Sequence, residues 1–585
     1  MFLKQVARVL VVLTFGSFAF AQTAGSPSLN DPIFAFMGNG GYDAQDYDIA
    51  LRIYATHQNI DGATTMQAVA TQDLRSFNLD FGSMVVTSVI VNGSMARFSQ
   101  ADPELTITPR KPILKGDAMK VSVTYSGKPA SVAVGTSQFG GDNFWMASPT
   151  QLTVLSEPSA MFAWSPVNDH PSDKATFSLH LTAPKTEQAI SNGVLTSRTE
   201  NSDGSATSNY RIGTPTATYF VVIAVGDYKL EEQGQVGNVR VRHYLSPKTS
   251  GIMRQAVLET PNIIKFFSEK IGAYPFPEVG VLTVNNNLGF ALETQSLVTV
   301  AASYGRGETV VDDSEIVAHE LAHQWFGALV SFKTHKDIFV HEGFAQYFGW
   351  LYTDFRYADQ GASLKGQIED VYGDVSVGSF VADMNKAQFL ERLRGNRYGT
   401  AVMSGQTLER ALVLMFENTL PQKYHDEIIA KFPNGATIKQ LAAVIETWNI
   451  TRVRLGSPSR VALIPLTGSL ALNVPASYGL LTPPGNLKLG DDLFNQGVYW
   501  RGAMTLHALR LNLGDERFFV LLRAYLEKFK FANASVEDFV NLTFEMDGLE
   551  AKTLLEHWLF DTQCPDFPEL GLFAKDFKLG ADFAN

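Results

Sequence analysis

The feature that most constrains this chain is the sequence His319-Glu320-Leu-Ala-His323. On an α-helix, residues four positions apart lie one turn above each other on the same face. The two imidazoles therefore point the same way, at a spacing that suits a single metal ion, and zinc is the usual occupant of such a site. A short match of this kind also occurs in ordinary polar helices whose histidines are merely hydrogen-bonded, so further features must decide.

Three features of residues 312–355 favour the metal interpretation. The sequence upstream predicts the start of a helix, with Asp312 as the expected N-cap and Glu315 three residues later. The positions around the histidines are apolar, which predicts a buried helix. A second helical run, residues 337–355, carries Glu342, which lies 19 positions after His323.

Two antiparallel helices can place the Glu342 carboxylate beside both imidazoles. Two histidines, one carboxylate and one open position are typical of a catalytic zinc site, whereas structural zinc sites are closed. We therefore predict one zinc ion held by His319, His323 and Glu342. Glu320, next to the ligands but not among them, is then positioned to deprotonate a metal-bound water.

Size and charge exclude several other classes of protein. A chain of 585 residues exceeds a single core, so two or more domains are expected. The net charge is −12 and no Lys/Arg cluster is present, which argues against nucleic acid as a partner. Cys564 is the only cysteine, so the chain has no internal disulfide and no cysteine-based metal site.

Residues 1–21 have the pattern of a signal peptide. Lys4 and Arg8 precede a short apolar run, residues 9–20, and Ala19-Phe20-Ala21 is a small-x-small cleavage site. The run is shorter than the ~20 apolar residues that a membrane-spanning helix needs. We expect an exported protein, secreted or periplasmic, with no integral membrane segment in the mature chain.

Residues 22–227 have a β pattern. Apolar and polar residues alternate through residues 47–53, 105–108 and 120–125, as in half-buried antiparallel strands. Asn92-Gly93, after an apolar run at residues 85–91, predicts a hairpin. A further strand is expected at residues 216–225.

Residues 228–585 are mainly helical in pattern. A helix is expected at residues 252–271, strands at 279–284 and 297–301, and helices after residue 498, at 518–529 and from the capping pair Ser535 and Asp538. The overall prediction is an α+β chain, with an antiparallel β-rich domain at residues 22–227 followed by a mainly helical domain at residues 228–585.

Three more polar residues carry only weak signals of their own. By spacing alone, Glu157 is an ordinary surface residue and Tyr499 a packing aromatic. Glu293 follows the strand expected at residues 279–284, beside the metal helix, where a strand edge can pair with an extended substrate.

Together these motifs resemble the aminopeptidase N family of zinc peptidases (gluzincins), which includes the leukotriene hydrolases. The resemblance implies that the mainly helical domain is a thermolysin-like peptidase domain. The likeness runs through most of the chain and is most specific at His-Glu-Leu-Ala-His-Gln-Trp-Phe-Gly and His-Glu-Gly-Phe-Ala, residues 319–327 and 341–345. It implies that His319, His323 and Glu342 bind zinc and that Glu320 is the general base. It also implies that Glu293 and Glu157 grip the substrate's free α-amino group and that Tyr499 stabilises the oxyanion.

The chain departs from the family pattern at several positions near these residues. Where the family has Gly, Met and Asn around the exopeptidase glutamate, this chain has Phe290, Leu292 and Thr294, and Ser165 and His341 replace a Phe and an Asn. These departures bear on side-chain preference and on the amino pocket. The chain also resembles a short form without the family's long C-terminal helical domain.

The interval between Glu342 and Tyr499 predicts an insert at about residues 373–481, with helices near 407–420 and 438–448. This insert either covers the mouth of the active site or is a peripheral decoration. The function expected for the chain is that of a zinc aminopeptidase acting on peptides with a free N-terminus, most simply as a monomer. The alternatives are an endopeptidase or another hydrolase on the same site, and a non-catalytic peptide-binding scaffold.

Overall fold

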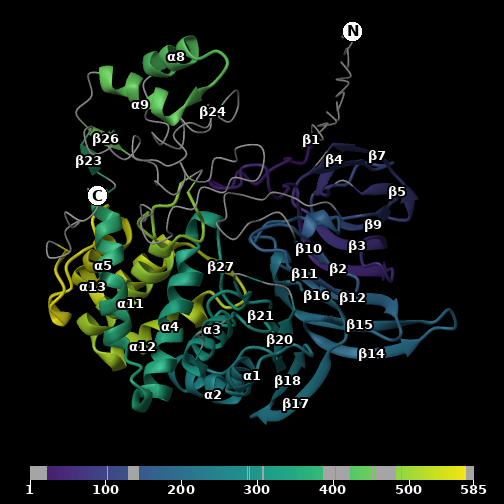
Figure 1. Ribbon diagram of the computed structural model, residues 1–585. Helices are drawn as coiled ribbons and strands as arrows, with labels where there is room; N and C mark the ends of the chain where they lie inside the picture. The colour runs from purple at the N-terminus through teal and green to yellow at the C-terminus, as the bar shows by residue number, and fades with distance from the viewer. Residues whose placement is uncertain are drawn as a thin grey trace, which may run out of the picture.

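The protein is described by a computed structural model that covers residues 23–574, except residues 83, 102, 130–143, 286–287, 289, 306–308, 382, 386–389, 391–401, 404–421, 449–451, 455–481 and 489–490. The expected signal peptide and the helix expected near residues 407–420 lie outside the described residues. Figure 1 shows a β-rich first half, purple to blue, beside a mainly helical second half, teal to yellow. The predicted order of a β-rich domain followed by a helical one is confirmed.

An eight-stranded sheet forms the body of the first half. Its order is β14 (Val194–Glu200), β15 (Ser205–Thr216), β12 (Ala175–Pro184), β2 (Tyr42–Ile53), β3 (Ile60–Ala70), β9 (Ala118–Gly127), β5 (Val85–Val91) and β6 (Ser94–Met95). All neighbours are antiparallel except β12 and β2. The expected hairpin joins β5 to β6, where Asn92 and Gly93 both have positive φ, as this tight turn requires.

Two four-stranded sheets complete the β-rich half. One has the order β1 (Thr23–Ala24), β4 (Leu74–Asp80), β8 (Glu104–Thr108) and β7 (Arg97–Ala101). The other has the order β10 (Trp145–Ala147), β11 (Gln151–Val154), β16 (Ile223–Gly226) and β13 (Gln188–Ser191). Inward side chains of the three sheets form one hydrophobic core, which includes Tyr47, Phe77, Trp164 and Phe177.

The strand expected at residues 216–225 is interrupted. β15 ends at Thr216, a 3-10 turn spans Thr218–Phe220, and β16 begins at Ile223. Adjacent residues of a strand face opposite sides. Tyr219 and Phe220 are both buried in the core of the helical half, and the turn allows both rings to enter it.

A five-stranded sheet begins the second half. Its order is β17 (Lys229–Val236), β18 (Val239–Leu245), β20 (Val281–Val284) and β21 (Val298–Ala301), with β19 (Glu278–Val279) also paired to β18. The strand expected at residues 279–284 is thus split at Gly280. A Cβ placed on Gly280 would lie 1.6 Å from the Arg242 carbonyl oxygen, so the close approach of these strands requires glycine.

The helix expected at residues 252–271 is two helices, α1 (Gly251–Leu258) and α2 (Thr260–Ile271). Pro261 lies in the first turn of α2. Proline lacks an N–H and clashes with the carbonyl of the preceding turn, so it begins a helix more readily than it continues one.

The helices α3 (Val310–Ala322) and α4 (Phe339–Tyr357) carry the predicted metal ligands, and further helices follow them in the chain. They are α5 (Leu364–Val381), α8 (Gln422–Lys431), α9 (Ile438–Thr447), α11 (Gly502–Leu513), α12 (Asp515–Lys528) and α13 (Val536–Phe560). Figure 1 shows α8 and α9 above the other helices, away from α3 and α4. The short pairs are β22 (Ser331–Phe332) with β27 (Asn533–Ala534), β23 (Asp383–Asn385) with β26 (Arg452–Arg454), and β24 (Val402–Met403) with β25 (Ala436–Thr437).

The segment between β1 and β2 joins the two halves. Ile33, Phe34 and Met37 are buried in the same core as α3 and α4, although the β-rich half follows them in sequence. We call residues 29–37 the N-terminal strap. Asn533 adds a second joint, donating hydrogen bonds to the Pro171 carbonyl at 2.9 Å and the Phe332 carbonyl at 2.8 Å.

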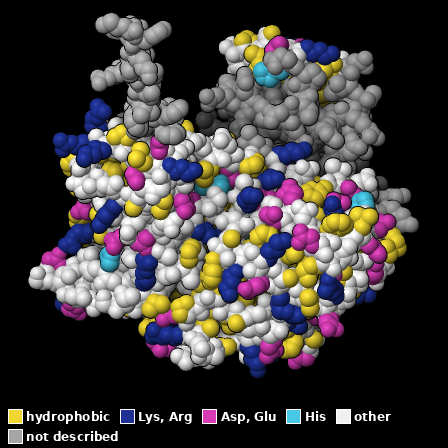
Figure 2. Space-filling model, turned by 180° about the vertical axis from the view of Figure 1, so that it is seen from behind, with side chains coloured by type: hydrophobic (Ala, Val, Ile, Leu, Met, Phe, Trp, Pro, Cys, Tyr) yellow, Lys and Arg dark blue, Asp and Glu magenta, His cyan; other side chains and the backbone are white. Residues whose placement is uncertain are grey.

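The surface carries both signs of charge. Figure 2 shows Lys and Arg side chains interspersed with Asp and Glu across the face turned to the viewer. Within the part of the chain that is described, no helix has both the length and the apolar character needed to cross a bilayer.

Candidate metal centre and active site

Helix α3 begins three residues before the position expected from the sequence. Thr309 is the N-cap, and its hydroxyl accepts the backbone N–H of Asp312 while the Asp312 carboxylate accepts the backbone N–H of Thr309. The prediction that Asp312 caps the helix with Glu315 was therefore wrong. In a Thr-x-x-Asp pair, each side chain accepts a backbone N–H group that has no partner within the helix. A cap at Asp312 would leave these two N–H groups without those acceptors.

The structure brings His319, His323 and Glu342 together. The Nε2 atoms of His319 and His323 lie 3.1 Å apart, and the Glu342 Oε2 lies 3.1 Å from the first and 3.3 Å from the second. All three side chains are buried. Two nitrogens and a carboxylate oxygen that converge on one point are the donor set of a zinc site.

A hydrogen bond behind His323 orients its ring toward that point. His323 Nδ1 lies 3.0 Å from the Phe326 carbonyl oxygen. Because a carbonyl only accepts, Nδ1 donates this hydrogen bond, and Nε2 is the nitrogen that faces Glu342 and His319. Metal-ligating histidines are held in this way by an outer acceptor.

The buried carboxylates of the site have opposite pKa shifts. Burial raises the pKa of Glu342, but His323 and His319 outweigh it and hold that pKa well below its usual range. Burial lowers the pKa of His323, yet Glu342 and Glu293 raise it to about 10. Burial, opposed by His323 but reinforced by Glu293, raises the pKa of Glu320 well above its usual range.

Glu157 and Glu293 lie at the same centre. Oxygen atoms of Glu157, Glu293 and Glu342 all lie within 4.8 Å of one another. The expectation from spacing that Glu157 is a surface residue was wrong, because its side chain is half-buried in the loop after β11. Buried Oε1 atoms of Glu157 and Glu293 lack hydrogen-bond partners in the described part of the chain, so the site presents acceptor atoms without a matching donor.

Gln324 fixes the segment that carries Glu293. Its Nε2 donates to the Glu293 carbonyl at 3.1 Å, and its Oε1 accepts the Ser296 N–H at 2.7 Å. Because Gln324 follows His323 directly, one stretch of chain sets both an imidazole and the backbone beside Glu293. Sequence reasoning missed this residue, since a glutamine after the motif has no distinctive spacing of its own.

Tyr499 reaches the centre from a single π-helical turn, Gly497–Arg501, that leads into α11. Its ring stacks on the ring of His319, with centroids 5.8 Å apart. Burial and the surrounding glutamates raise the pKa of Tyr499 well above its usual range, so the hydroxyl keeps its proton and remains a donor. Tyr499 does pack, as spacing suggested, and it packs on a residue of the site.

Arg501 anchors this turn. It is fully buried, and it donates to the Trp558 carbonyl at 2.7 Å, the His557 carbonyl at 3.1 Å and the Asp561 carbonyl at 2.7 Å. These carbonyls close the end of α13, so Arg501 ties the segment of Tyr499 to another helix. Arg501 was not among the predicted site residues, and the only sequence feature that could have pointed to it is its position two residues after Tyr499.

His341, one of the departures from the family pattern, does not face the converging nitrogens with an open lone pair. Its Nε2 accepts the Phe332 N–H at 3.2 Å, and its Nδ1 lies 3.3 Å from the Tyr219 hydroxyl. Burial lowers the pKa of His341 well below its usual range. The residue therefore links α4 to β22 and to the turn after β15.

Comparison with known families identifies two regions. Residues 43–220 match the peptidase M1 N-terminal domain. Residues 256–384 and 485–558 match the peptidase family M1 domain, with residues 385–484 between the matched parts.

Several curated proteins are similar in sequence. Aminopeptidase M1-A of Oryza sativa subsp. japonica is 24% identical over 433 residues, which are 72% of this chain and 38% of that protein. Aminopeptidase N of Acetobacter pasteurianus is 25% identical over 362 residues, which are 57% of this chain and 99% of that protein. The chain matches less than two fifths of the length of the rice protein and of human endoplasmic reticulum aminopeptidase 1, 34% in the latter case.

Solved structures share the fold. The M1 zinc metallopeptidase of Deinococcus radiodurans has a TM-score of 0.66 and 24% identity, over 92% of this chain and 98% of that one. A substitution variant of the same enzyme, bound to a Tyr-Ser-Ala substrate, has a TM-score of 0.66 over 93% of this chain and all of that one.

Proposed function

This chain belongs to peptidase family M1, and we propose that it is a zinc-dependent aminopeptidase that removes the N-terminal residue of peptides. The observation that carries the proposal is the meeting of two kinds of group at one place. His319, His323 and Glu342 form a metal-binding triangle, and the carboxylates of Glu157 and Glu293 lie within reach of it.

The residues present fit zinc. Two imidazole nitrogens and a carboxylate oxygen 3.1 to 3.3 Å apart match a site with three protein ligands and one open position. The surplus of buried carboxylates also calls for a cation. Zinc, when bound, polarises the scissile carbonyl and lowers the pKa of a water toward ~7.

Glu320 is the proposed general base. It lies on α3 between the two histidines, and its raised pKa favours acceptance of a proton from water. The same carboxyl group then donates that proton to the leaving amine. Tyr499 donates its hydroxyl proton in a hydrogen bond to the oxygen that becomes negatively charged.

Glu157 and Glu293 are the proposed amine-binding residues. A substrate ammonium between them would neutralise carboxylates that lack partners. One such pair at ~4 Å, in an effective dielectric near ~20, contributes about 4 kcal/mol before desolvation. Binding the amine sets which peptide bond meets the metal, and this explains the release of a single N-terminal residue.

The proposal is tested with paired substrates. An aminoacyl anilide or a peptide with a free amine should be cleaved, its N-acetylated counterpart should resist, and a chelator should abolish activity. Glu320→Gln should bind zinc normally and lose activity by at least about 10³-fold. Equal cleavage of the acetylated peptide would indicate an endopeptidase, and binding without hydrolysis by the zinc-loaded protein would indicate a scaffold.

Export and domain division are also part of the proposal. We propose a signal peptide at residues 1–21, a β domain at 22–227 and a catalytic domain at 228–585 with an insert at about 373–481. The described part of the insert includes α9, whose capping box at Thr437 and Gln440 supports the helix expected there. Mass spectrometry of protein from the culture medium and periplasm of the source organism tests export, and deletion of the insert followed by assays on long peptides tests its role.

A further inference from the structure

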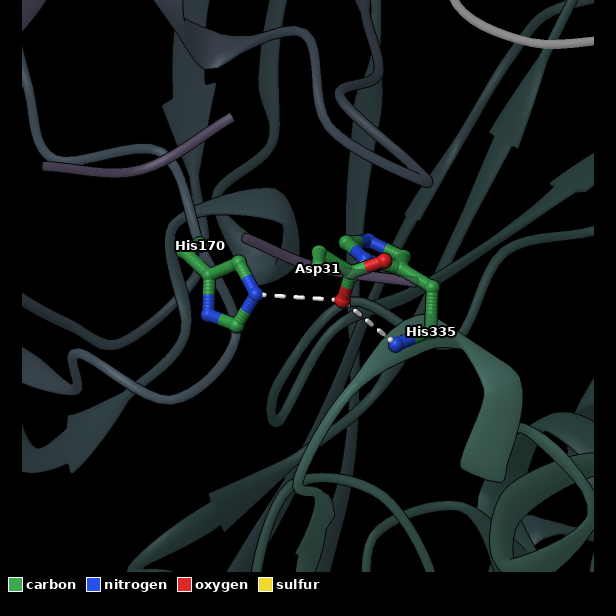
Figure 3. A group of neighbouring side chains, drawn as sticks. All are labelled: Asp31, His170 and His335. Carbon is green, nitrogen blue, oxygen red and sulfur yellow. Dashed lines mark hydrogen bonds and ion pairs between the residues drawn. The ribbon is translucent and has the colours of Figure 1, made fainter. Parts of the chain in front are cut away.

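A second cluster of metal-ligand side chains lies at the joint between the two halves. Asp31 of the N-terminal strap, His170 of the β-rich half and His335 of the turn before α4 offer ligand atoms within 4.8 Å of one another. The three side chains are 1%, 3% and 0% exposed, respectively. Figure 3 shows the Asp31 carboxylate between the two histidines.

Hydrogen bonds within the cluster already engage both oxygens of the Asp31 carboxylate. Asp31 Oδ2 lies 3.2 Å from His170 Nε2 and 3.0 Å from His335 Nδ1, and it also accepts the His335 backbone N–H at 2.9 Å. Its other oxygen accepts the N–H groups of Ile33 and Phe34. The carboxylate oxygen thus occupies the point on which the nitrogens converge, whereas in the His319–His323 pair two nitrogens face each other.

His335 connects Asp31 to the loop that carries Glu157, one of the proposed amine-binding residues. Its Nδ1 faces Asp31 Oδ2, and its Nε2 lies 3.3 Å from the carbonyl oxygen of Pro158, the residue after Glu157. The ring thus bridges the two segments, with Nδ1 toward Asp31 and Nε2 toward Pro158. The ring is held by Phe34, with centroids 4.6 Å apart in an edge-to-face arrangement.

Burial raises the pKa of Asp31, but hydrogen bonds from His170 and His335 hold it well below its usual range, so the carboxylate is charged. His170 donates from Nε2, because its Nδ1 accepts the Ser172 N–H at 3.2 Å. Asp31 is therefore tied to both halves of the molecule.

We propose that Asp31 and His335 are positioning residues that hold the Pro158 carbonyl and thereby fix the Glu157 carboxylate for recognition of the substrate's ammonium. The neighbours of Pro158 are anchored as well: the Ser156 hydroxyl accepts the Trp164 indole N–H at 3.1 Å, and the Ser159 hydroxyl donates to the Asp169 carbonyl at 2.7 Å. His335 is a polar contact that joins this loop to the half of the chain that holds the metal ligands, beside the apolar contacts of Ala160 and Phe162 with the core of that half. The inference rests on the proposed aminopeptidase function.

Two substitutions separate the two contacts of the ring. Asparagine places an amide nitrogen near the position of Nδ1, so His335→Asn retains the contact to Asp31 and loses the one to Pro158. Glutamine places its amide nitrogen near the position of Nε2, so His335→Gln retains the contact to Pro158. A purely structural role predicts that both variants behave alike.

His57 offers a matched control. It is fully buried in the β-rich half, with Nδ1 2.8 Å from the Ser148 carbonyl and Nε2 3.1 Å from the Glu187 carboxylate. It therefore bridges a carbonyl and a carboxylate as His335 does, with no contact to the loop of Glu157. His57→Asn and His57→Gln report the general cost of replacing such a ring.

The readout is a ratio of inhibition constants. Leucine hydroxamate and its analogue without the amino group both chelate zinc, and they differ only in the ammonium, so their ratio measures the amine pocket alone. We expect His335→Asn to reduce the preference for the amino compound about tenfold, the equivalent of ~1.4 kcal/mol, and His335→Gln to stay within about threefold of the wild type. Both His57 variants should keep the wild-type ratio, and all five proteins should hold one zinc per chain.

Three results would overturn this inference but leave the proposed function standing. The first two are an inhibition ratio in His335→Asn equal to that of the wild type, and an equal fall of the ratio in both His335 variants. The third is a fall of the ratio in the His57 variants in proportion to the decrease in their thermal unfolding midpoints. A second zinc per wild-type chain that is lost in Asp31→Asn would show the cluster to be a metal site instead. A wild-type enzyme with no preference for the amino compound would overturn the proposed function itself, and the inference with it.

Discussion

Glutamate is used in two opposite ways within one site. Glu342 is held ionised by His323 and His319, while Glu320, one residue from His319 on the same helix, is pushed toward its neutral form by burial and by Glu293. Two residues of the same type thus have different expected roles: Glu342 as a metal ligand and Glu320 as a carrier of a proton. Environment, and not residue type, assigns these roles.

Tyr499→Phe tests the expected oxyanion donor. The ring stack on His319 is retained, and only the hydroxyl is lost. We expect kcat to fall about 10²-fold to 10³-fold, with KM and zinc content unchanged, because the donor is needed only in the transition state. Steady-state kinetics and metal analysis measure this, and a change confined to KM would contradict it.

Glu104→Gln tests a buried charge in β8. Burial, opposed only by Asn78, raises the pKa of Glu104 from 4.5 to about 7, and its Oε2 has no hydrogen-bond partner in the described residues. Between these two pKa values the folded state binds more protons than the unfolded one, so stability falls as pH rises through that window. Relative to the wild type, Glu104→Gln should gain about 1–2 kcal/mol between pH ~4.5 and ~7.5, allowing for partial exposure. Denaturant titrations at both pH values measure the difference, and equal pH slopes would refute it.

At the residue scale, the meeting of His319, His323 and Glu342 could be predicted, but the joint between the two halves could not. Helical spacing places His319 and His323 on one face, and two antiparallel helices can bring Glu342 beside them. Asp31 and His335 are 304 positions apart and meet only through tertiary folding, for which the chain carries no periodic signal.

At the scale of elements, helix boundaries follow local hydrogen bonding. Ser535 and Asp538 were predicted to cap α13, and the capping box is present. The start of α3 was misplaced because Thr309, three residues before Asp312, makes the same kind of box. The interruption of residues 216–225 could not be predicted, since its cause is the core of the other domain, which buries Tyr219 and Phe220.

Removal of the N-cap side chains of α3 and α13 should decrease the unfolding free energy by a similar, modest amount. Ser535→Ala and Thr309→Ala each remove one side-chain acceptor for an N-terminal N–H. Each should lower the unfolding free energy by about 1 kcal/mol, and neither should change kcat/KM, because neither residue is among those assigned to the site. Thermal unfolding of the zinc-loaded variants, with Thr309→Ser as the control that keeps the cap, provides the measurement. An unaltered midpoint for both alanine variants would show that these boxes contribute nothing.

At the scale of the whole molecule, the N-terminal strap binds the β-rich half to the helical half. Its residues Ile33, Phe34 and Met37 are part of the core around α3 and α4, and Asp31 adds polar contacts to both sides. The order of a β-rich half before a helical half could be predicted from the change in periodicity near residue 228. The strap could not, because residues 29–37 have neither helical nor strand periodicity.

Phe34→Ala tests how strongly the strap stabilises the molecule. Phe34 is 4% exposed and contacts the ring of His335. Removing a buried phenyl ring costs about 3–5 kcal/mol, from lost transfer free energy and the cavity left behind. Phe36→Ala, at an exposed position two residues away, should cost little and serves as the control. Equal unfolding midpoints for the two variants would show that the strap is dispensable.

The strap also has a consequence for synthesis on the ribosome. Asp31 is translated long before His335, and Glu157 long before Tyr499, so the first part of the chain emerges without the surface to which it will bind. Contacts over such separations form late in folding. A partly translated chain therefore lacks a complete set of the residues assigned to catalysis, and hydrolytic capacity arises only once residue 499 has left the exit tunnel.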